Sequence, residues 1–255
     1  MINKLEITNL SYRYPDEDHS ALQDVSLDVI NDNIVAILGN NGSGKTTLLL
    51  LVLKKILPQK GMIQYRSDNG NGEQKIHVGY LPQIEKIPYG FTVIEYVMMG
   101  RYPYIGWLNM PDENDQEISY RVIRDLHIEK LSKKRLGDLS GGELQKVRIA
   151  RLLTQEPDVL LMDEPANHLD LKNRRELLDI IATLKDEKKI IFFTTHDPND
   201  AIGVANQVLL MKEGKVVAFG QTNTVIQQDN LQKTFDIPIK LQQFNKKMVV
   251  IPGER

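Results

Sequence analysis

The residues best suited to chemistry in this chain lie in one glycine-containing loop between two apolar runs. The loop has the pattern G-x-x-x-x-G-K-T, follows residues 34–38 and precedes residues 48–53. Its members are Gly39, Asn40, Asn41, Gly42, Ser43, Gly44, Lys45, Thr46 and Thr47. Between a strand and a helix, this pattern predicts a cradle of backbone N–H groups for the phosphates of a nucleotide. Lys45 would contact the β- and γ-phosphates, and Thr46 would be a ligand of Mg²⁺.

Two acids at the end of a later apolar run supply groups that phosphate hydrolysis needs. Residues 159–162 are apolar enough for a buried strand, and Asp163 and Glu164 follow them directly. Ligands of α/β proteins bind at the carboxyl ends of such strands. We therefore predict that Asp163 binds Mg²⁺, and that Glu164 orients or deprotonates a water in line with the γ-phosphate.

Two more polar residues come directly after predicted strands. Gln83 follows the strand expected at 76–81, and its amide could reach Mg²⁺ or the attacking water. His196 follows the strand expected at 190–195 and could donate a hydrogen bond to the γ-phosphate. Taken alone, a glutamine or a histidine at such a position is typical of a surface or a turn. Their combination with the phosphate loop favours the catalytic interpretation.

The segment Ser140-Gly141-Gly142-Glu143 predicts a helix start that a phosphate could approach closely. Ser140 and Glu143 form a capping box, and the two glycines lower helix propensity but leave the first backbone N–H groups bare. The phosphate loop already provides the cradle for one triphosphate. The simplest interpretation is that this helix start meets the nucleotide of a second copy of the chain; an ordinary capped helix is the alternative.

An aromatic ring near the amino end could stack on the nucleotide base, which any π face tolerates. Tyr12 and Tyr14 both lie just before a turn at Pro15, and we select Tyr14 for this role. The alternative is that both tyrosines are packing residues of a sheet.

The elements that must position these groups are strands at both ends of the chain and helices in the middle. Residues 4–7 and 25–29 alternate with period two, as half-buried antiparallel strands do, and 61–65 reads as a further strand. The segment 68–72 is a turn, and Glu213-Gly214 marks a hairpin between strands at 208–211 and 215–219.

The segment 84–138 differs in character and predicts a helical insertion. Thr92 and Glu95 form a capping box that opens a helix through Met99, and Gly100 is expected to end it. A second amphipathic helix is expected over 115–125. The aromatic cluster at 101–107, which includes the single Trp, is either the core of this insertion or a surface for a partner.

Composition limits the classes of function. The 255 residues are 41% hydrophobic and 26% charged, as in soluble globular proteins, and the net charge of −2 provides no basic field for nucleic acid. The absence of Cys excludes disulfides, a thiol nucleophile and Cys metal sites. The longest apolar runs are too short to span a bilayer, and Glu6 interrupts any signal-peptide-like start.

Taken together, these residues resemble the ATP-binding-cassette (ABC) ATPase family over nearly all of residues 1–230. The resemblance rests on motifs in the family's order: the phosphate loop, Gln83, the signature Leu139-Ser140-Gly141-Gly142-Glu143, Asp163-Glu164, Asp170 and His196. It implies an α/β fold: a P-loop NTPase core with a mainly parallel sheet, an antiparallel β subdomain and an inserted α-helical subdomain. The ATPase domain would cover 1–230, with the helical subdomain at about 84–157 and an appended segment at 231–255.

The resemblance also implies how the protein works and with what. Two copies would form a head-to-tail dimer that holds two ATP molecules, with Mg²⁺, between each phosphate loop and the opposing Ser140-Gly141-Gly142. Tyr14 would contact adenine, Asp170 would communicate across the dimer, and the helical subdomain would contact an integral membrane permease at the cytoplasmic face of the membrane. A substrate-binding protein would complete the system, and no nucleic acid partner is expected. Ala166, where many relatives carry Thr, removes a hydroxyl but no catalytic group.

Within the family, residues 99–104 and 194–198 look like subunits of importers for metal chelates, such as iron–siderophore, haem or cobalamin, or for related oxyanions. Three alternatives stay open at this point. Residues 167–170 also look like the corresponding loop of relatives that act on ribosomes, which would make this a soluble cassette for ribosome or nucleic acid. The catalytic residues would equally suit the ATPase subunit of an exporter. The third alternative is a nucleotide-binding regulatory module without catalysis, which Glu164 and His196 disfavour.

Overall fold

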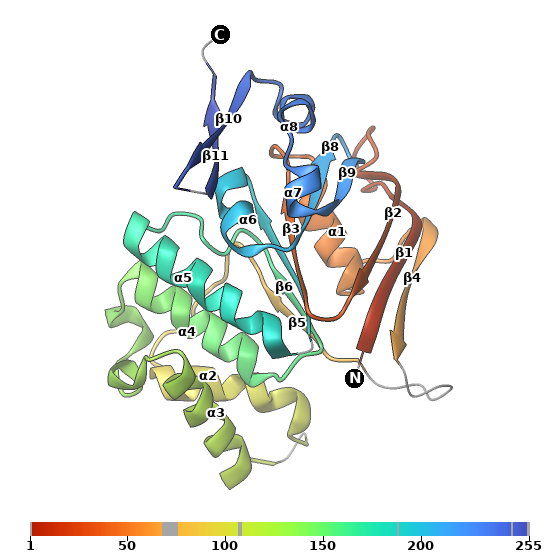
Figure 1. Cartoon of the computed structure of the whole chain (residues 1–255). Helices are drawn as coiled ribbons and strands as arrows, with labels where there is room; N and C mark the ends of the chain where they lie inside the picture. Colours follow the sequence, from red (N-terminus) through yellow and green to blue (C-terminus); the bar gives the residue numbers. More distant parts are fainter. Residues whose placement is uncertain (1, 68–75, 107–108, 188, 246, 254–255) are drawn as a thin grey trace.

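The computed structural model describes residues 2–67, 76–106, 109–187, 189–245 and 247–253 (Figure 1). Over this part of the chain, the strands form a six-stranded sheet, a three-stranded sheet and a two-stranded hairpin. Helices lie mainly to one side of the large sheet, toward the lower left of Figure 1. The predicted turn at 68–72 and the single Trp at 107 fall outside the described residues.

The large sheet carries the residues that were predicted to do chemistry at the ends of its strands. Its order is β5-β6-β7-β3-β8-β9, with parallel pairing from β5 to β8 and antiparallel pairing of β9. The strands are β3 (Asn33–Leu38), β5 (Val78–Leu81), β6 (Val159–Met162), β7 (Ile190–Thr195), β8 (Gln207–Lys212) and β9 (Lys215–Gln221). The prediction of a mainly parallel sheet is confirmed, although β5 begins at Val78 and not at Ile76. The predicted hairpin is confirmed as well, with positive φ angles at Glu213 and Gly214.

Strand β3 shows how the sheet separates two hydrophobic clusters. All six of its residues are buried, as expected of a strand that is covered on both faces. Because side chains alternate between the faces, Ile34, Ala36 and Leu38 pack into one cluster while Val35 and Ile37 pack into the other. The first cluster includes the helices of the middle of the chain, and the second includes α1 (Lys45–Val52) and the three-stranded sheet.

The three-stranded sheet is antiparallel and lies beyond α1, at the right of Figure 1. It consists of β1 (Ile2–Tyr12), β2 (Leu22–Ile30) and β4 (Lys60–Ser67), in the order β2-β1-β4. These strands contain the period-two segments 4–7 and 25–29, so the predicted antiparallel subdomain is confirmed. The chain leaves β1 at Tyr12 and returns at Leu22, and the connecting segment reaches the phosphate loop.

Helices fill the chain between β5 and β6, two strands that are neighbours in the large sheet. They are α2 (Val93–Met98), η1 (Met99–Tyr104), α3 (Glu113–Asp125), η2 (Glu129–Leu131), η3 (Leu136–Asp138) and α4 (Gly141–Thr154). The predicted helical insertion is present, and the capping box of Thr92 and Glu95 forms as expected. Its limits at 84 and 157, like the domain limit at 230, stay predictions, because one hydrophobic cluster joins residues of all these segments.

The helix α2 does not simply end at Gly100, as the sequence suggested. It passes into the 3₁₀ helix η1, in which Gly100 is buried. A Cβ at this position would lie 2.5 Å from the carbonyl oxygen of Arg151 on α4. Gly100 is therefore a site of close helix approach, and the α-helix tightens here instead of stopping.

The buried Arg101 gives a structural reason for the stretch 99–104. Its guanidinium donates to Asp115 at 2.9 Å, to Glu156 at 2.9 Å and to the carbonyl oxygen of Thr154 at 3.0 Å. It also lies over the ring of Tyr104, 4.2 Å from the centroid. Arg101 thus joins η1, the start of α3 and the end of α4, while Tyr102 and Tyr104 stay 58% and 40% exposed.

The remaining elements follow β6. They are α5 (Leu171–Thr183), η4 (Leu184–Glu187), α6 (Pro198–Val204), α7 (Thr222–Val225), α8 (Gln228–Phe235), β10 (Ile239–Phe244) and β11 (Lys247–Pro252). The last two form a hairpin that lies at the top of Figure 1. The side chain of Asn199 on α6 accepts from the backbone N–H of Val250 at 2.9 Å and donates to its carbonyl oxygen at 3.1 Å. The appended segment is therefore fixed to the helix that follows His196.

Candidate functional site

The phosphate loop lies between β3 and α1, and its glycines have backbone angles that other residues rarely adopt. Gly42 has φ 77° and Gly44 has φ 99°. At Gly44 a Cβ would also lie 2.5 Å from the carbonyl oxygen of Ala21, so the backbone conformation and the close packing both require glycine. Gly44 caps α1 without a side-chain hydrogen bond. The first N–H groups of α1 are thus free of a side-chain cap and can bind an anion.

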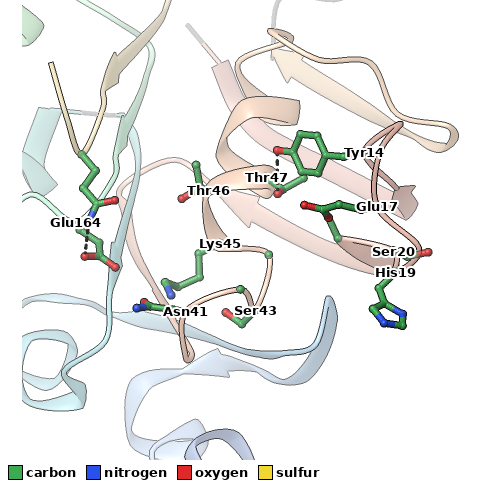
Figure 2. Close-up of a pocket in the computed structure, with 14 residues that line it drawn as sticks. Tyr14, Glu17, His19, Ser20, Asn41, Ser43, Lys45, Thr46, Thr47 and Glu164 are labelled. Atoms are coloured by element: carbon green, nitrogen blue, oxygen red, sulfur yellow. Dashed lines mark hydrogen bonds between the residues drawn. The ribbon is translucent and has the colours of Figure 1, made fainter. Parts of the chain in front are cut away.

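Lys45 is the cation of this loop and is buried, with 6% of its surface exposed. Its Nζ donates to the carbonyl oxygens of Gly39 at 2.8 Å and Asn40 at 3.0 Å, which hold the ammonium at the loop. Burial lowers the pKa of Lys45, and the charges of Glu164 and Asp163 oppose that shift. The side chain extends toward the side of the pocket on which Glu164 lies (Figure 2).

Asp163 connects the phosphate loop to the neighbouring strands β6 and β7. Its Oδ2 accepts from the Thr46 hydroxyl at 2.8 Å, and its Oδ1 accepts from the Thr194 hydroxyl at 2.7 Å. The structure thus brings together two of the predicted Mg²⁺ ligands, Thr46 and Asp163, whereas the third, Gln83, donates to Glu164. Hard oxygen donors of this kind suit Mg²⁺, which commonly takes one or two protein ligands and fills its shell with phosphates and water. The described residues contain no cluster of three or more His, Cys, Asp or Glu that would suit a dedicated protein cage for a metal.

Glu164 is held in place by two side-chain amides. Its Oε2 accepts from Gln83 at 3.0 Å and from Asn167 at 2.8 Å, and His196 Nδ1 lies 3.9 Å from the same oxygen. The backbone N–H of Glu164 donates to the Thr194 hydroxyl at 2.7 Å. Its φ of 47° is unusual for a non-glycine residue, and such angles often occur at functional sites.

A pocket of about 410 Å³ extends from the phosphate loop to the segment that follows β1 (Figure 2). Tyr14 lines it, and its hydroxyl lies 3.3 Å from Thr47 Oγ1. Tyr12 packs edge-on against Tyr14, with ring centroids 5.0 Å apart, and lines a separate depression. The structure therefore brings Tyr14, not Tyr12, to the phosphate loop. The other lining residues are Glu17, His19, Ser20, Ala21, Asn41, Gly42, Ser43, Gly44, Lys45, Thr46, Thr47, Gln83 and Glu164.

Several of these residues were not identified from the sequence. Glu17 and His19 enter the pocket because a turn, with Glu17 N–H donating to Tyr14 C=O at 3.2 Å, folds residues 14–17 back beside the phosphate loop. Pro15 after Tyr14 was the available signal for that turn. Asn167 was also missed as a partner of Glu164. The available signal was its position three residues after Glu164. This spacing suits a turn, which the structure closes with a hydrogen bond from Asn167 N–H to Glu164 C=O at 3.1 Å.

Gly141 and Gly142 at the start of α4 have different surroundings. The capping box of Ser140 and Glu143 forms as predicted. A Cβ on Gly141 would meet no atom within 4 Å, whereas one on Gly142 would lie 2.2 Å from the side chain of Asn173. Gly142 thus has a packing role within its own chain, while Gly141 leaves open space. None of the described residues that line the pocket at the phosphate loop belongs to 140–142.

Asp170 caps α5 and contacts the residue that packs against Gly142. Its carboxylate accepts from the backbone N–H of Asn173 at 2.8 Å and from the side-chain amide of Asn173 at 2.8 Å. These hydrogen bonds lower the pKa of Asp170. Asn173 therefore connects Asp170 to the start of α4 within one chain.

Two polar residues on the buried side of α4 join this helix to the loops that hold Glu164. Gln145 donates to the carbonyl oxygen of Pro165 at 2.7 Å, and Arg148 donates to that of Pro82 at 2.6 Å. Arg148 also donates to Gln145 at 2.7 Å and to Glu85 at 3.1 Å. The sequence offered only their i, i+3 spacing as a signal. They connect α4 to Pro165, which follows Glu164, and to Pro82, which precedes Gln83.

Comparison with known proteins decides the family. The family model described as ABC transporter matches residues 22–167, which include the phosphate loop, the signature and Asp163-Glu164. The chain belongs to the ABC transporter family. This ABC protein is an ATPase subunit. Of the motifs on which the sequence resemblance rested, the phosphate loop, Gln83 and Glu164 line one pocket. The signature begins α4, Asp170 caps α5, and His196 lines a separate small cavity beside Glu164.

Two relatives of this ABC subunit are named for the transport of molybdate and of chelated iron. The molybdate import ATP-binding protein MolC of Haemophilus influenzae is 32% identical over 245 residues, which cover 95% of this chain and 92% of MolC. YfeB of Yersinia pestis, named a chelated iron transport system membrane protein, is 30% identical over 235 residues, covering 91% of this chain and 79% of YfeB. A solved structure described as an inward-facing transporter of the metal-chelate type has a TM-score of 0.88 and 29% identity, covering 100% of this chain and 98% of that one.

Proposed function

We propose that this ABC subunit hydrolyses ATP to drive import of a metal chelate through a separate permease. The observation that carries the proposal is the pocket in which Lys45, Thr46 and Glu164 surround the place for the terminal phosphates. The names of the relatives, which refer to molybdate and chelated iron, support import of a metal-containing substrate. The sequences of 99–104 and 194–198, which look like those of metal-chelate importers, support the same subgroup.

The working unit in this proposal is a head-to-tail dimer of two copies. The pocket at the phosphate loop is lined by that loop and by Tyr14, Gln83 and Glu164, but not by the described residues 140–142 of the same chain. Gly141 leaves open space at the bare start of α4, where a phosphate could approach. We propose that Ser140, Gly141 and Gly142 of the partner copy complete the site, and that Asp170 lies at this interface.

Within each site the residues have distinct roles. Lys45, supported by the backbone carbonyls of the loop, binds the β- and γ-phosphates together with the N–H groups of residues 40–47. Thr46 and Asp163 would hold Mg²⁺, which when bound neutralises phosphate charge. Gln83 and Asn167 fix the carboxylate of Glu164 so that it can accept a proton from the attacking water. Gln83 could also reach the metal, and His196 donates a hydrogen bond to the γ-phosphate.

ATP hydrolysis is coupled to transport because the γ-phosphate of ATP bridges the two copies of the subunit. ATP binds the closed dimer better than the open one because both copies contact its terminal phosphate, and hydrolysis removes that difference.

Exposed apolar side chains lie around the start of the helical region, where we propose that the permease contacts the subunit at the cytoplasmic face of the membrane. These side chains are Ile84, Tyr89, Phe91 and Tyr102. Among the described helices, none is long and apolar enough to cross a bilayer itself.

The proposed stacking of Tyr14 on adenine can be tested by variants that remove or keep its aromatic ring. Tyr14→Ala should weaken ATP binding about tenfold, since stacking of a base on an aromatic ring contributes about 1–3 kcal/mol. Tyr14→Phe keeps the ring and should bind ATP nearly as the parent does. Tyr12→Ala is the matched control, because Tyr12 touches Tyr14 but lines a separate depression. Calorimetric titration measures the dissociation constants; a larger loss for Tyr12→Ala than for Tyr14→Ala would contradict the assignment.

The transport function can be tested by reconstitution. The subunit should purify with its permease and, in liposomes, support ATP-dependent uptake of a radiolabelled ferric chelate. Molybdate and Mn²⁺ serve as competing cargoes, and the Glu164→Gln variant controls for uptake without hydrolysis. Co-purification with ribosomes or RNA in place of a permease, or ATP-driven efflux of the chelate, would show that the proposal is wrong.

A further inference from the structure

Arg174 on α5 bridges two residues that lie close to His196 on its carboxyl side. Its Nε donates to Asp200 Oδ1 at 2.9 Å, and its terminal nitrogen lies 2.5 Å from Asp197 Oδ2 and 2.7 Å from Asp200 Oδ1. Asp197 follows His196 directly, and Asp200 lies in the first turn of α6. No feature of the sequence singled out Arg174, and the mechanism above does not use it.

Asp200 makes this bridge more than a surface ion pair. Only 5% of its surface is exposed, and its second oxygen accepts from the Thr195 hydroxyl at 3.0 Å. Burial raises the pKa of Asp200, while the charge of Arg174 opposes that shift. A buried carboxylate that loses its cation is strongly destabilised. Thr195 and Asp197, the two neighbours of His196, are therefore anchored to α5 through Arg174 and Asp200.

The His196 ring is held far less firmly than the backbone around it. It is 58% exposed, and its described contact within the site is the 3.9 Å approach to Glu164. A small cavity of about 70 Å³ lies beside it, lined by the loop 166–169 as well as by Arg174 and Asp200. The direction in which His196 points thus depends on its backbone, and that backbone depends on Arg174.

Arg174 also lies one helical turn from Asp170. Its backbone N–H donates to Asp170 C=O at 2.8 Å, in the turn that the Asp170 carboxylate caps. A displacement of the loop 167–170 would therefore move Arg174 with it. The loop 167–170, which we place at the interface between copies, is thus connected to His196. The connection runs through the first turn of α5 and then through the ion pairs of Arg174 with Asp197 and Asp200.

We propose that Arg174 is a positioning residue that couples the Asp170 loop to the orientation of His196. When a second copy meets the loop, α5 shifts and Arg174 sets His196 for the γ-phosphate. The inference rests on the proposed function, because it assumes that His196 contacts this phosphate. Arg174 itself touches no nucleotide, so its loss acts on the rate of hydrolysis and not on ATP affinity.

The first experiment separates turnover from binding. Arg174→Ala should lower kcat for ATP by about tenfold or more, because a misplacement of about 1 Å can cost about 10²-fold in rate. KM for ATP should stay within about twofold, and Arg174→Lys should recover only part of the rate, since one ammonium cannot reproduce the forked geometry. Arg175→Ala is the matched control. Arg175 follows Arg174 directly, is 63% exposed and pairs with Asp179 on the surface, so its loss should leave turnover unchanged.

The second experiment asks whether Arg174 acts through His196. Adding Arg174→Ala to a His196→Ala protein should leave the residual kcat unchanged within about twofold, because the positioned group is already missing. Equal losses in both backgrounds would overturn the inference. If His196→Ala is inactive while Arg174→Ala has full activity, the inference fails and the proposed function stands. Full activity of His196→Ala would instead show that the catalytic role proposed for His196 is wrong.

A third variant keeps the test decisive if Arg174→Ala does not fold. Asp197→Asn keeps the cap of α6, where Asp197 accepts from Asn199 N–H at 2.9 Å, and leaves the ion pair of Arg174 and Asp200 intact. It removes the charged contact next to His196. A fall in kcat at unchanged melting temperature and unchanged KM would support the inference, and turnover equal to that of the parent would overturn it.

Discussion

Glu164→Gln is expected to bind ATP, to stay in the closed dimer and to hydrolyse ATP about 10²- to 10⁴-fold more slowly than the parent, the range for loss of a general base. The amide oxygen of the variant can still accept from Gln83 and Asn167, so the shape of the site is retained. It cannot accept a proton from water at neutral pH. The γ-phosphate therefore remains in place and continues to join the two copies.

Two measurements check this expectation on one sample. Phosphate release gives the rate, and size-exclusion chromatography with ATP and Mg²⁺ gives the fraction of dimer. Glu117→Gln on the outer surface of α3, where Glu117 pairs with Arg124, is a suitable control and should behave as the parent in both. Normal phosphate release by Glu164→Gln would remove Glu164 from the role of base. Slow release without a stable dimer would count against the bridging role of the γ-phosphate.

Lys45→Ala is expected to reduce ATP affinity about 10²-fold or more. Two hydrogen bonds from the ammonium to phosphate oxygens, at about 1.5 kcal/mol each for charged partners, amount to about 3 kcal/mol. Lys45 also donates to the carbonyls of Gly39 and Asn40, so the variant loses part of the support of the loop. Calorimetric titration with ATP measures the affinity, and thermal unfolding shows whether the fold is retained.

The control for this variant is Lys55→Ala, which removes an exposed lysine shortly after α1 and should not change ATP binding. Unchanged affinity in Lys45→Ala would contradict the cradle that we describe. Combining Lys45→Ala with Glu164→Gln adds a further check. Lys45→Ala in the Glu164→Gln background should abolish the ATP-dependent dimer, because the nucleotide that joins the copies no longer binds.

The sequence by itself determined the parts of the site whose chemistry is local. A strand, three glycines, Lys45 and Thr46 predict a phosphate loop because backbone angles and helix starts act within a few residues. The apolar runs that end in Asp163-Glu164 and in His196 predicted parallel strands with polar ends, and the large sheet places these ends beside the loop. The period-two strands and the capping boxes followed from equally local patterns.

The tertiary structure decided what depends on contacts between distant segments. It brought Tyr14, not Tyr12, to the pocket, showed that Gly100 and Gly142 allow close packing, and placed Asn167 on Glu164. It also formed the bridge from Arg174 to Asp197 and Asp200, over 20 residues along the chain. Such contacts leave no periodic trace in a sequence, because partners on different elements have no fixed spacing; only the packing of the elements chooses among them.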